Sequence, residues 1–322
     1  MTVLVYVEHQ AGALDEPSLQ ALALARGYAQ AGPVEAFAAG AGAASLASEL
    51  GAHGVSTLHV AEHDVFSSHA PSALGQSLVE LAGRLAPAAV VGPGTERGNE
   101  VMAHVAAKAD LPMAANCLEA APGDPATATR VRWGGSLLEE ARLHGVTKLL
   151  TVQPHAVAAE PVGGAPASVE TFAPALSEAD LRVRVSGRAG EAAGGVSLAE
   201  AKVVVSAGRG AGSAEGFGIV EELAELLGGA VGCSRAVTMA GWRAHTDQVG
   251  QTGTKIAPDL YIACGISGAT QHMAGCKGAK KILAINNDPE APIFASADYA
   301  VIGDLHEILP AISAEIRKAR GA

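Results

Sequence analysis

The chain has 322 residues, of which 49% are hydrophobic, so it is long enough to bury a large core and to hold two domains. The formal net charge is −11, and residues 1–190 alone carry 11 basic and 19 acidic side chains, so the basic field that binds nucleic acid is absent. No apolar run reaches membrane-spanning length, and Met1 leads directly into an apolar stretch instead of a signal peptide. We therefore expect a cytoplasmic protein with no membrane span and no nucleic-acid partner.

The first 112 residues alternate between short apolar stretches and amphipathic stretches. The predicted strands are 3–7, 34–38, 56–60 and 88–92, and the predicted helices are 18–31, 43–50, 74–86 and 99–109. This alternation predicts a parallel, doubly wound α/β sheet. At the end of the last of these strands, Thr95, Glu96 and Arg97 are expected to cap a helix and form salt bridges and not to act in catalysis.

After Pro112 the pattern changes to consecutive strands. These are predicted at 127–133, 136–143, 147–152, 167–172 and 181–185, with a hairpin turn at Gly134-Gly135. The first domain is therefore a doubly wound α/β domain with added β-strands. The small, Gly-rich stretch 188–197 predicts a linker, and we expect domains at 1–190 and 191–322.

Strands and helices alternate again in the second domain. The predicted strands are 202–207, 230–233, 260–264, 281–286 and 299–303, and the predicted helices are 215–227, 268–277 and 304–320. Ser267 is expected to be the N-cap of the middle helix, because its hydroxyl can accept from an unpaired N–H of the first turn. This pattern predicts a second parallel sheet.

Metal binding and disulfide bonding are not expected. The four cysteines form no C-x-x-C pair and are interpreted as core residues; they are Cys117, Cys233, Cys264 and Cys276. Four histidines crowd one region, namely His53, His59, His63 and His69. Because the strand that ends near His59 gives no helical spacing with His63, solvated loop positions are favoured over a metal site.

Nearly every predicted strand of the second domain ends in polar or Gly-rich residues. These are Gly208–Gly210, Ser234-Arg235, Gly265–Gly268, Asn286–Asp288 and Gly303-Asp304. In an open parallel sheet such loops share the edge where ligands bind. Arg209 and Arg235 are suited to phosphate or another anion, and Asn286 and Asp304 to an adenine or ribose edge. The alternative interpretation is surface charge for the arginines and a simple turn before Pro289 for Asn286.

The stretch 249–272, VGQTGTKIAPDLYIACGISGATQH, organises this domain. It predicts a Gly-rich loop suited to a planar polar ligand, then a buried strand, then a loop that opens a helix whose backbone N–H groups can face a phosphate. An ordinary strand-to-helix turn is the alternative. Residues 208–212 read GRGAG and not GxGxxG, and 250–255 is not a P-loop, so the site is dinucleotide-like without the usual fingerprint.

Several segments resemble the flavin domain of the electron transfer flavoprotein α subunit. They are VSAGRG (205–210), VGCSRAVTMAGW (231–242), the stretch 249–272 and INNDPEAPIFASADYAVIGDL (285–305). VLVYVEHQAGALDEPSLQALALA (3–25) resembles the N-terminus of that family, so the likeness covers essentially the whole chain. One departure is Trp242, where other members often carry another aromatic residue.

The resemblance implies one bound FAD and a heterodimer with an electron transfer flavoprotein β subunit, with residues 1–190 at the interface. It implies an electron carrier and not an enzyme, one that takes electrons from acyl-CoA or other dehydrogenases and passes them singly to a quinone reductase, as in fatty acid β-oxidation. AMP or a second FAD is expected in the β subunit and not in this chain.

The resemblance also assigns cofactor-binding residues in this sequence. It places Arg209 and Ser267 on the phosphate side. It places Asn286, Asp304 and Leu305 at the adenosine end. At the flavin and ribityl end it places Ser234, Arg235, Gln251, Thr252 and His272. The same motifs imply contacts from Val249, Gly250, Gly268, Ala269, Thr270 and Gln271.

Two of these residues have expected roles in tuning the flavin. Arg235 is expected to raise the flavin reduction potential, because a fixed cation favours the reduced anion. His272 is expected to donate a hydrogen bond near the flavin C2 carbonyl and so favour the one-electron-reduced anion, with the charge of the imidazole left open.

Three alternatives to a simple electron carrier remain. The first is the α subunit of an electron-bifurcating flavoprotein, with a second flavin in the β subunit. The second is a self-contained flavin or NAD-dependent oxidoreductase, which would need a general acid or base that only His272 offers. The third, a small adenine-nucleotide-binding regulatory protein, accounts for the first domain only.

Overall fold

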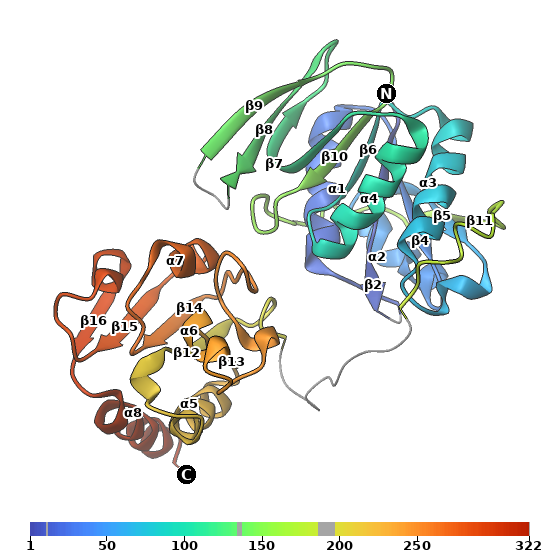
Figure 1. The fold of residues 1–322 in the computed structure, drawn as a ribbon. Coiled ribbons are helices and arrows are strands. Elements are labelled where there is room, and N and C mark those ends of the chain that lie inside the picture. The colour runs from blue at the N-terminus through green and yellow to red at the C-terminus, as the bar shows by residue number, and fades with distance from the viewer. Residues whose placement is uncertain (11, 134–136, 186–196, 322) are drawn as a thin grey trace. The chain divides into compact units, whose positions relative to one another are not determined.

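The computed structural model describes residues 1–10, 12–133, 137–185 and 197–321. The chain divides into two compact units, residues 1–189 and residues 190–322, and each is described by itself (Figure 1). The predicted hairpin turn at Gly134-Gly135 lies outside the described residues, as does the predicted linker 188–197 except for Ser197.

In unit 1 nine of the described strands form one large twisted sheet. In sheet order they are β11 (Ser168–Phe172), β5 (Val55–Ala61), β4 (Val34–Ala39), β1 (Val3–Tyr6), β6 (Ala89–Pro93), β10 (Lys148–Val152), β7 (Met113–Ala121), β8 (Ala126–Arg132) and β9 (Leu137–Leu143). Neighbours from β11 to β7 pair in parallel, while β7, β8 and β9 pair antiparallel at one edge (Figure 1). The predicted doubly wound α/β sheet with added strands is therefore confirmed.

Helices cover both faces of this sheet because its central strands are apolar on both sides. The helices are α1 (Glu16–Ala29), α2 (Ala47–Ala52), α3 (Pro71–Leu85) and α4 (Glu96–Ala109), with short 3₁₀ turns at Ala43–Leu46 and Asp64–Ser67. Val3 and Val5 of β1 pack with α1 and α2, whereas Leu4 packs with α3 and α4. Thr95 caps α4 as predicted, accepting from Gly98 N at 2.8 Å.

Three local predictions for unit 1 are wrong. Residues 181–185 form no strand; the side chain of Asp180 instead accepts from the backbone N–H of Ser177 and pairs with Lys108. Strand β7 was missed, because its alternation of small and half-buried residues gives a weak apolar signal. Within the described residues, Glu96 and Arg97 form no ion pair. A small additional hairpin, β2 (His9–Gln10) and β3 (Ala13–Leu14), follows β1.

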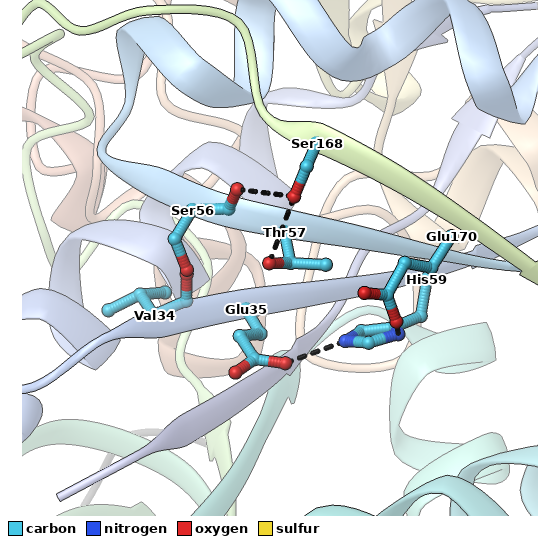
Figure 2. Close-up of polar contacts among 7 residues, drawn as sticks. All are labelled: Val34, Glu35, Ser56, Thr57, His59, Ser168 and Glu170. Atoms are coloured by element: carbon cyan, nitrogen blue, oxygen red, sulfur yellow. Dashed lines mark hydrogen bonds and ion pairs between the residues drawn. The ribbon is translucent and has the colours of Figure 1, made fainter.

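The prediction of solvated loop histidines is wrong for His53 and His59, which are both buried. His59 lies within β5 and is only 4% exposed. Its Nε2 lies 2.6 Å from Oε2 of Glu35 on β4, and its Nδ1 lies 3.5 Å from Oε2 of Glu170 on β11 (Figure 2). Parallel pairing therefore inserts this ring between two carboxylates. No group of three or more described His, Cys, Asp or Glu side chains could hold a metal ion.

Unit 2 is a smaller parallel sheet with helices on both faces (Figure 1). In sheet order its strands are β13 (Ala230–Cys233), β12 (Val203–Ala207), β14 (Leu260–Cys264), β15 (Ile282–Asn286) and β16 (Tyr299–Ile302). The helices are α5 (Gly218–Leu227), α6 (Arg235–Met239), α7 (Thr270–Cys276) and α8 (Leu305–Arg320), with 3₁₀ turns at Arg209–Ala211, Glu215–Phe217, His245–Asp247 and Pro292–Ser296. Helices α5 and α8 pack on one face and α7 on the other.

The four cysteines are free and buried, which confirms their interpretation as core residues. Among the helices that the structure describes, none is long and apolar enough to cross a membrane.

Candidate functional site

The site lies where the order of strands in the unit 2 sheet reverses. The chain adds β13 on one side of β12 and then crosses to place β14 on the other side. The loops after β12 and β14 meet there, with Gly208 N donating to Cys264 O at 2.9 Å and Gly210 N donating to Gly265 O at 3.3 Å. In open α/β sheets ligands bind at such a point, outside the carboxyl ends of the strands.

A cavity of about 520 Å³ opens at this edge of the sheet, within the size range of small-molecule sites. All of the predicted cofactor residues line it except Gly268 and Thr270. Those that line it are Arg209, Ser234, Arg235, Val249, Gly250, Gln251, Thr252, Ser267, Ala269, Gln271, His272, Asn286, Asp304 and Leu305. Residues from five strand ends, far apart in sequence, therefore share one wall.

Gly268 does not line the cavity, but its backbone conformation shapes the loop that does. Its φ is +85°, and a Cβ at this position would lie 2.4 Å from Ile293 N, so only glycine fits. The turn also overturns the predicted cap: α7 begins at Thr270 with Ala269 at the N-cap, and no side chain caps it. Because Gly268 leaves the helical conformation, Ser267 lies before the helix, where it lines the cavity and its carbonyl accepts from Ile293 N at 3.0 Å.

The Gly-rich loop 249–254 rests on α7. Gly250 N lies so close to Gly275 that a Cβ on Gly275 would approach it to 2.3 Å, and Gln251 N donates to Gln271 O at 2.7 Å. The side chain of Gln248, which is buried, donates to Thr252 Oγ1 at 3.0 Å. These contacts hold the loop against the mouth of the cavity.

His272 lines the cavity and is 7% exposed. Its Nε2 lies 2.7 Å from Tyr261 Oη, and its Nδ1 is buried without a hydrogen-bond partner in the described chain. Burial lowers the pKa of His272 to about 4, and the nearby Val249 backbone, which favours the protonated ring, offsets only part of this effect. The imidazole is therefore neutral near pH 7, a charge that the sequence alone left open.

Arg209 and Arg235 both line the cavity and are exposed. Arg209 begins the 3₁₀ turn after β12, and Arg235 is the first residue of α6. Neither guanidinium group has an ion-pair partner within the part of the chain that the structure describes. Two uncompensated cations at one edge suit an anionic ligand.

Asn286 and Asp304 use part of their hydrogen-bonding capacity within the protein. Asn286 Nδ2 donates to Ile266 O at 3.0 Å, and Oδ1 accepts from Asp288 N at 3.1 Å. Asp304 is the N-cap of α8, accepting from His306 N at 2.8 Å. Both residues therefore hold the loops that frame the cavity.

Comparisons with known proteins match both units. The family model described as "Electron transfer flavoprotein FAD-binding domain" matches residues 197–277, and the one described as "Electron transfer flavoprotein domain" matches residues 3–177. "Electron transfer flavoprotein subunit alpha" of Mycobacterium leprae is 38% identical over 320 residues, covering 99% of each chain. The proteins of the same name from Mycobacterium tuberculosis strain H37Rv and Bacillus subtilis are 39% and 34% identical, each match covering at least 97% of both chains.

The chain belongs to the electron transfer flavoprotein α subunit family. The resemblance seen in the sequence is thereby confirmed, and FAD is the cofactor that its family domain binds.

The residues of this electron transfer flavoprotein chain fit such a cofactor. The exposed guanidinium groups of Arg209 and Arg235 suit its phosphates. The glycines after β12 and β14 allow close backbone approach, and His272 places a buried imidazole nitrogen without a partner beside the cavity. When bound, the flavin ring supplies the capacity to accept electrons.

Several cavity residues of this α-subunit chain were not among the predicted cofactor residues. They are Gly208, Gly210, Ala236, Gln248, Gly265, Ile266, Asn287, Asp288, Ala291 and Gly303. Most belong to the strand-end loops that the sequence had singled out, and contribute mainly backbone. Gln248 lies outside every segment that the sequence had singled out, since its place in the wall depends on tertiary packing.

Proposed function

We propose that the chain is the FAD-binding α subunit of a heterodimeric electron transfer flavoprotein. It accepts electrons from dehydrogenases, acyl-CoA dehydrogenases among them, and passes them singly to a quinone reductase or another acceptor. The observation that carries this proposal is the cavity at the switch point of unit 2, lined by Arg209, Arg235 and His272. It lies in a chain that electron transfer flavoprotein α subunits match from end to end.

The cavity side chains support electron carriage more than substrate turnover. Burial lowers the pKa of His272 to about 4, which makes the imidazole a weak base, and its Nε2 already contacts Tyr261, so it is poorly placed to act as a general base. Arg209 and Arg235 supply positive charge, and the loops supply backbone N–H groups. These groups would bind the phosphates, orient the ring and set its preference for the reduced form. The organic chemistry would belong to the partner dehydrogenase.

We assign the contact with the β subunit to residues 1–190. Unit 1 exposes large apolar side chains just after β8 and on β9, including Trp133 at 79% and Leu138 at 69% exposure. Exposed apolar side chains that are close together are typical of protein–protein contacts. The cytoplasm is the proposed location, and the β subunit would hold AMP or a second FAD.

Copurification with the β subunit, followed by extraction of the cofactors, tests this proposal. One FAD and one AMP per heterodimer, with reduction by an acyl-CoA dehydrogenase and its substrate, supports simple electron carriage. Two FADs per heterodimer with NADH as donor would support the bifurcating alternative. Turnover of an organic substrate by the heterodimer alone would overturn the proposal in favour of a self-contained oxidoreductase.

A further inference from the structure

Tyr261 and His272 form a buried pair behind the wall of the cavity. Tyr261 lies in β14 and is fully buried, and His272 lies in α7. The phenol oxygen is 2.7 Å from Nε2, and the two ring centroids are 6.1 Å apart with planes inclined by 31°. A contact this short and this buried fixes the orientation of the imidazole.

Both members of the pair are neutral at pH 7. Burial raises the pKa of the Tyr261 phenol well above its ordinary value and lowers the pKa of His272 to about 4. A neutral imidazole carries one hydrogen, on either Nδ1 or Nε2, and the hydrogen bond made by one nitrogen decides which. The position of that hydrogen therefore depends on whether Tyr261 donates to Nε2 or accepts from it.

The burial of the phenol favours donation by Tyr261. Nε2 of His272 is the one hydrogen-bond partner that the described chain gives to the Tyr261 hydroxyl, which is fully buried. A buried O–H needs an acceptor for its hydrogen, and Nε2 is the acceptor within reach. The ring hydrogen of the neutral imidazole then lies on Nδ1, the nitrogen that Tyr261 leaves free.

We propose that Tyr261 is a positioning residue that donates its hydrogen to Nε2 and so holds His272 as the neutral Nδ1–H tautomer, a hydrogen-bond donor at the wall of the FAD cavity. Nδ1 is the one buried nitrogen of this ring left without a partner. A neutral donor there can stabilise negative charge on a carbonyl of the bound ligand without placing a full charge in the wall. The identity of that ligand rests on the proposed function; the tautomer does not.

The tautomer is measured on the αβ heterodimer after FAD removal, by ¹⁵N NMR of ring-labelled histidine, with His272→Gln to assign the signal. The expected result is the Nδ1–H form in the wild type and a shift toward the Nε2–H form in Tyr261→Phe, which keeps the ring and removes only the hydroxyl. Tyr299→Phe is the matched control, because Tyr299 is exposed on β16. An Nε2–H tautomer in the wild type would overturn the inference. An Nδ1–H tautomer that stays the same in Tyr261→Phe would overturn it as well.

The second measurement restores FAD and records its dissociation constant and the reduction potential of each electron step. Tyr261→Phe should weaken FAD binding by roughly 2- to 10-fold, as loss of one oriented hydrogen bond does, and lower the potential of the first step. If Tyr261→Phe does not fold, the wild-type tautomer decides the matter. An Nδ1–H tautomer in a heterodimer that binds no FAD would contradict the proposed function but not the positioning role.

Discussion

Thr95 Oγ1 donates to Glu8 Oε2 over 2.7 Å, and this contact joins the end of β1 to the N-cap of α4. Strands β1 and β6 are neighbours at the point where the strand order of the unit 1 sheet reverses. Glu8 is 8% exposed, and its Oε1 has no hydrogen-bond partner among the described residues. Burial raises the pKa of this carboxyl from 4.5 to about 7, against the opposing effect of the Thr95 hydrogen bond.

Glu8→Gln should therefore flatten the pH dependence of stability between pH 5 and pH 8. The folded chain binds a proton at Glu8 more tightly than the unfolded chain does, so the stabilisation is complete below pH 4.5 and is lost as the pH rises through 7. Over that interval the free energy of unfolding of the wild type should fall by about 3 kcal/mol more than that of the glutamine variant. Urea denaturation at a series of pH values measures this difference. Parallel curves for the two proteins would show that Glu8 ionises normally.

His272 should give a pH dependence of the opposite sign. Because burial lowers the pKa of its imidazole from 6.5 to about 4, the unfolded chain binds the proton more tightly. The stabilisation is therefore complete above pH 6.5 and falls as the pH drops toward 4, by about 3 kcal/mol in total. His272→Gln should remove this acid loss from the unfolding transition of the FAD-free heterodimer. If the variant loses as much stability as the wild type when the pH falls toward 4, the imidazole is not buried in its neutral form.

Arg235→Ala should lower the reduction potential of the bound FAD while most of the FAD is retained. Removing an exposed cation from the cavity wall weakens the preference for the reduced anion, and about 1.4 kcal/mol of lost preference corresponds to a tenfold shift in the equilibrium. Spectroelectrochemistry provides the potential. Arg317→Ala is the control. Arg317 lies on α8, where it pairs with Glu222 of α5, and neither residue lines the cavity. Equal potentials in Arg235→Ala and the control would assign Arg235 to the surface or to a partner contact.

Gly268→Ala should destabilise unit 2 and reduce its FAD content. A methyl group at φ +85° would also lie 2.4 Å from Ile293 N, so the loop after β14 must shift, at a cost of about 2 kcal/mol or more. Gly218→Ala, at the start of α5, is the matched control, because nothing lies within 4 Å of the added Cβ and helix propensity improves. Thermal unfolding measures the stability of the two variants, and flavin absorbance measures their FAD content. Retention of full stability in Gly268→Ala would mean that the loop has room to adjust.

Much of unit 2 could be predicted because its signals are local. Leu260–Cys264 is an apolar run buried on both faces, and its bounds are those predicted. Arg209 and Arg235 were found because each follows a strand of a parallel sheet, and parallel strands end at a common edge. The cap at Ser267 was wrong because Gly268 turns the chain before α7 begins, a backbone choice set by packing against Ile293.

Other features depend on contacts between distant segments. His59 is buried because sheet register places it between Glu35 and Glu170. Gln248 enters the cavity wall because the stretch after α6 pairs with Cys233 of β13. Neither contact has a local pattern in the sequence, so no reading of periodicity or spacing could have found them.

The most direct test of the account is hydrogen–deuterium exchange of the αβ heterodimer with FAD bound and after FAD removal. The cavity in unit 2 predicts that FAD slows amide exchange in three segments of this chain, 208–212, 249–254 and 265–272, while the β1 and β6 loops of unit 1 exchange equally in both states. Slowed exchange confined to unit 1 or to the β subunit would contradict the assignment of the FAD site to this cavity.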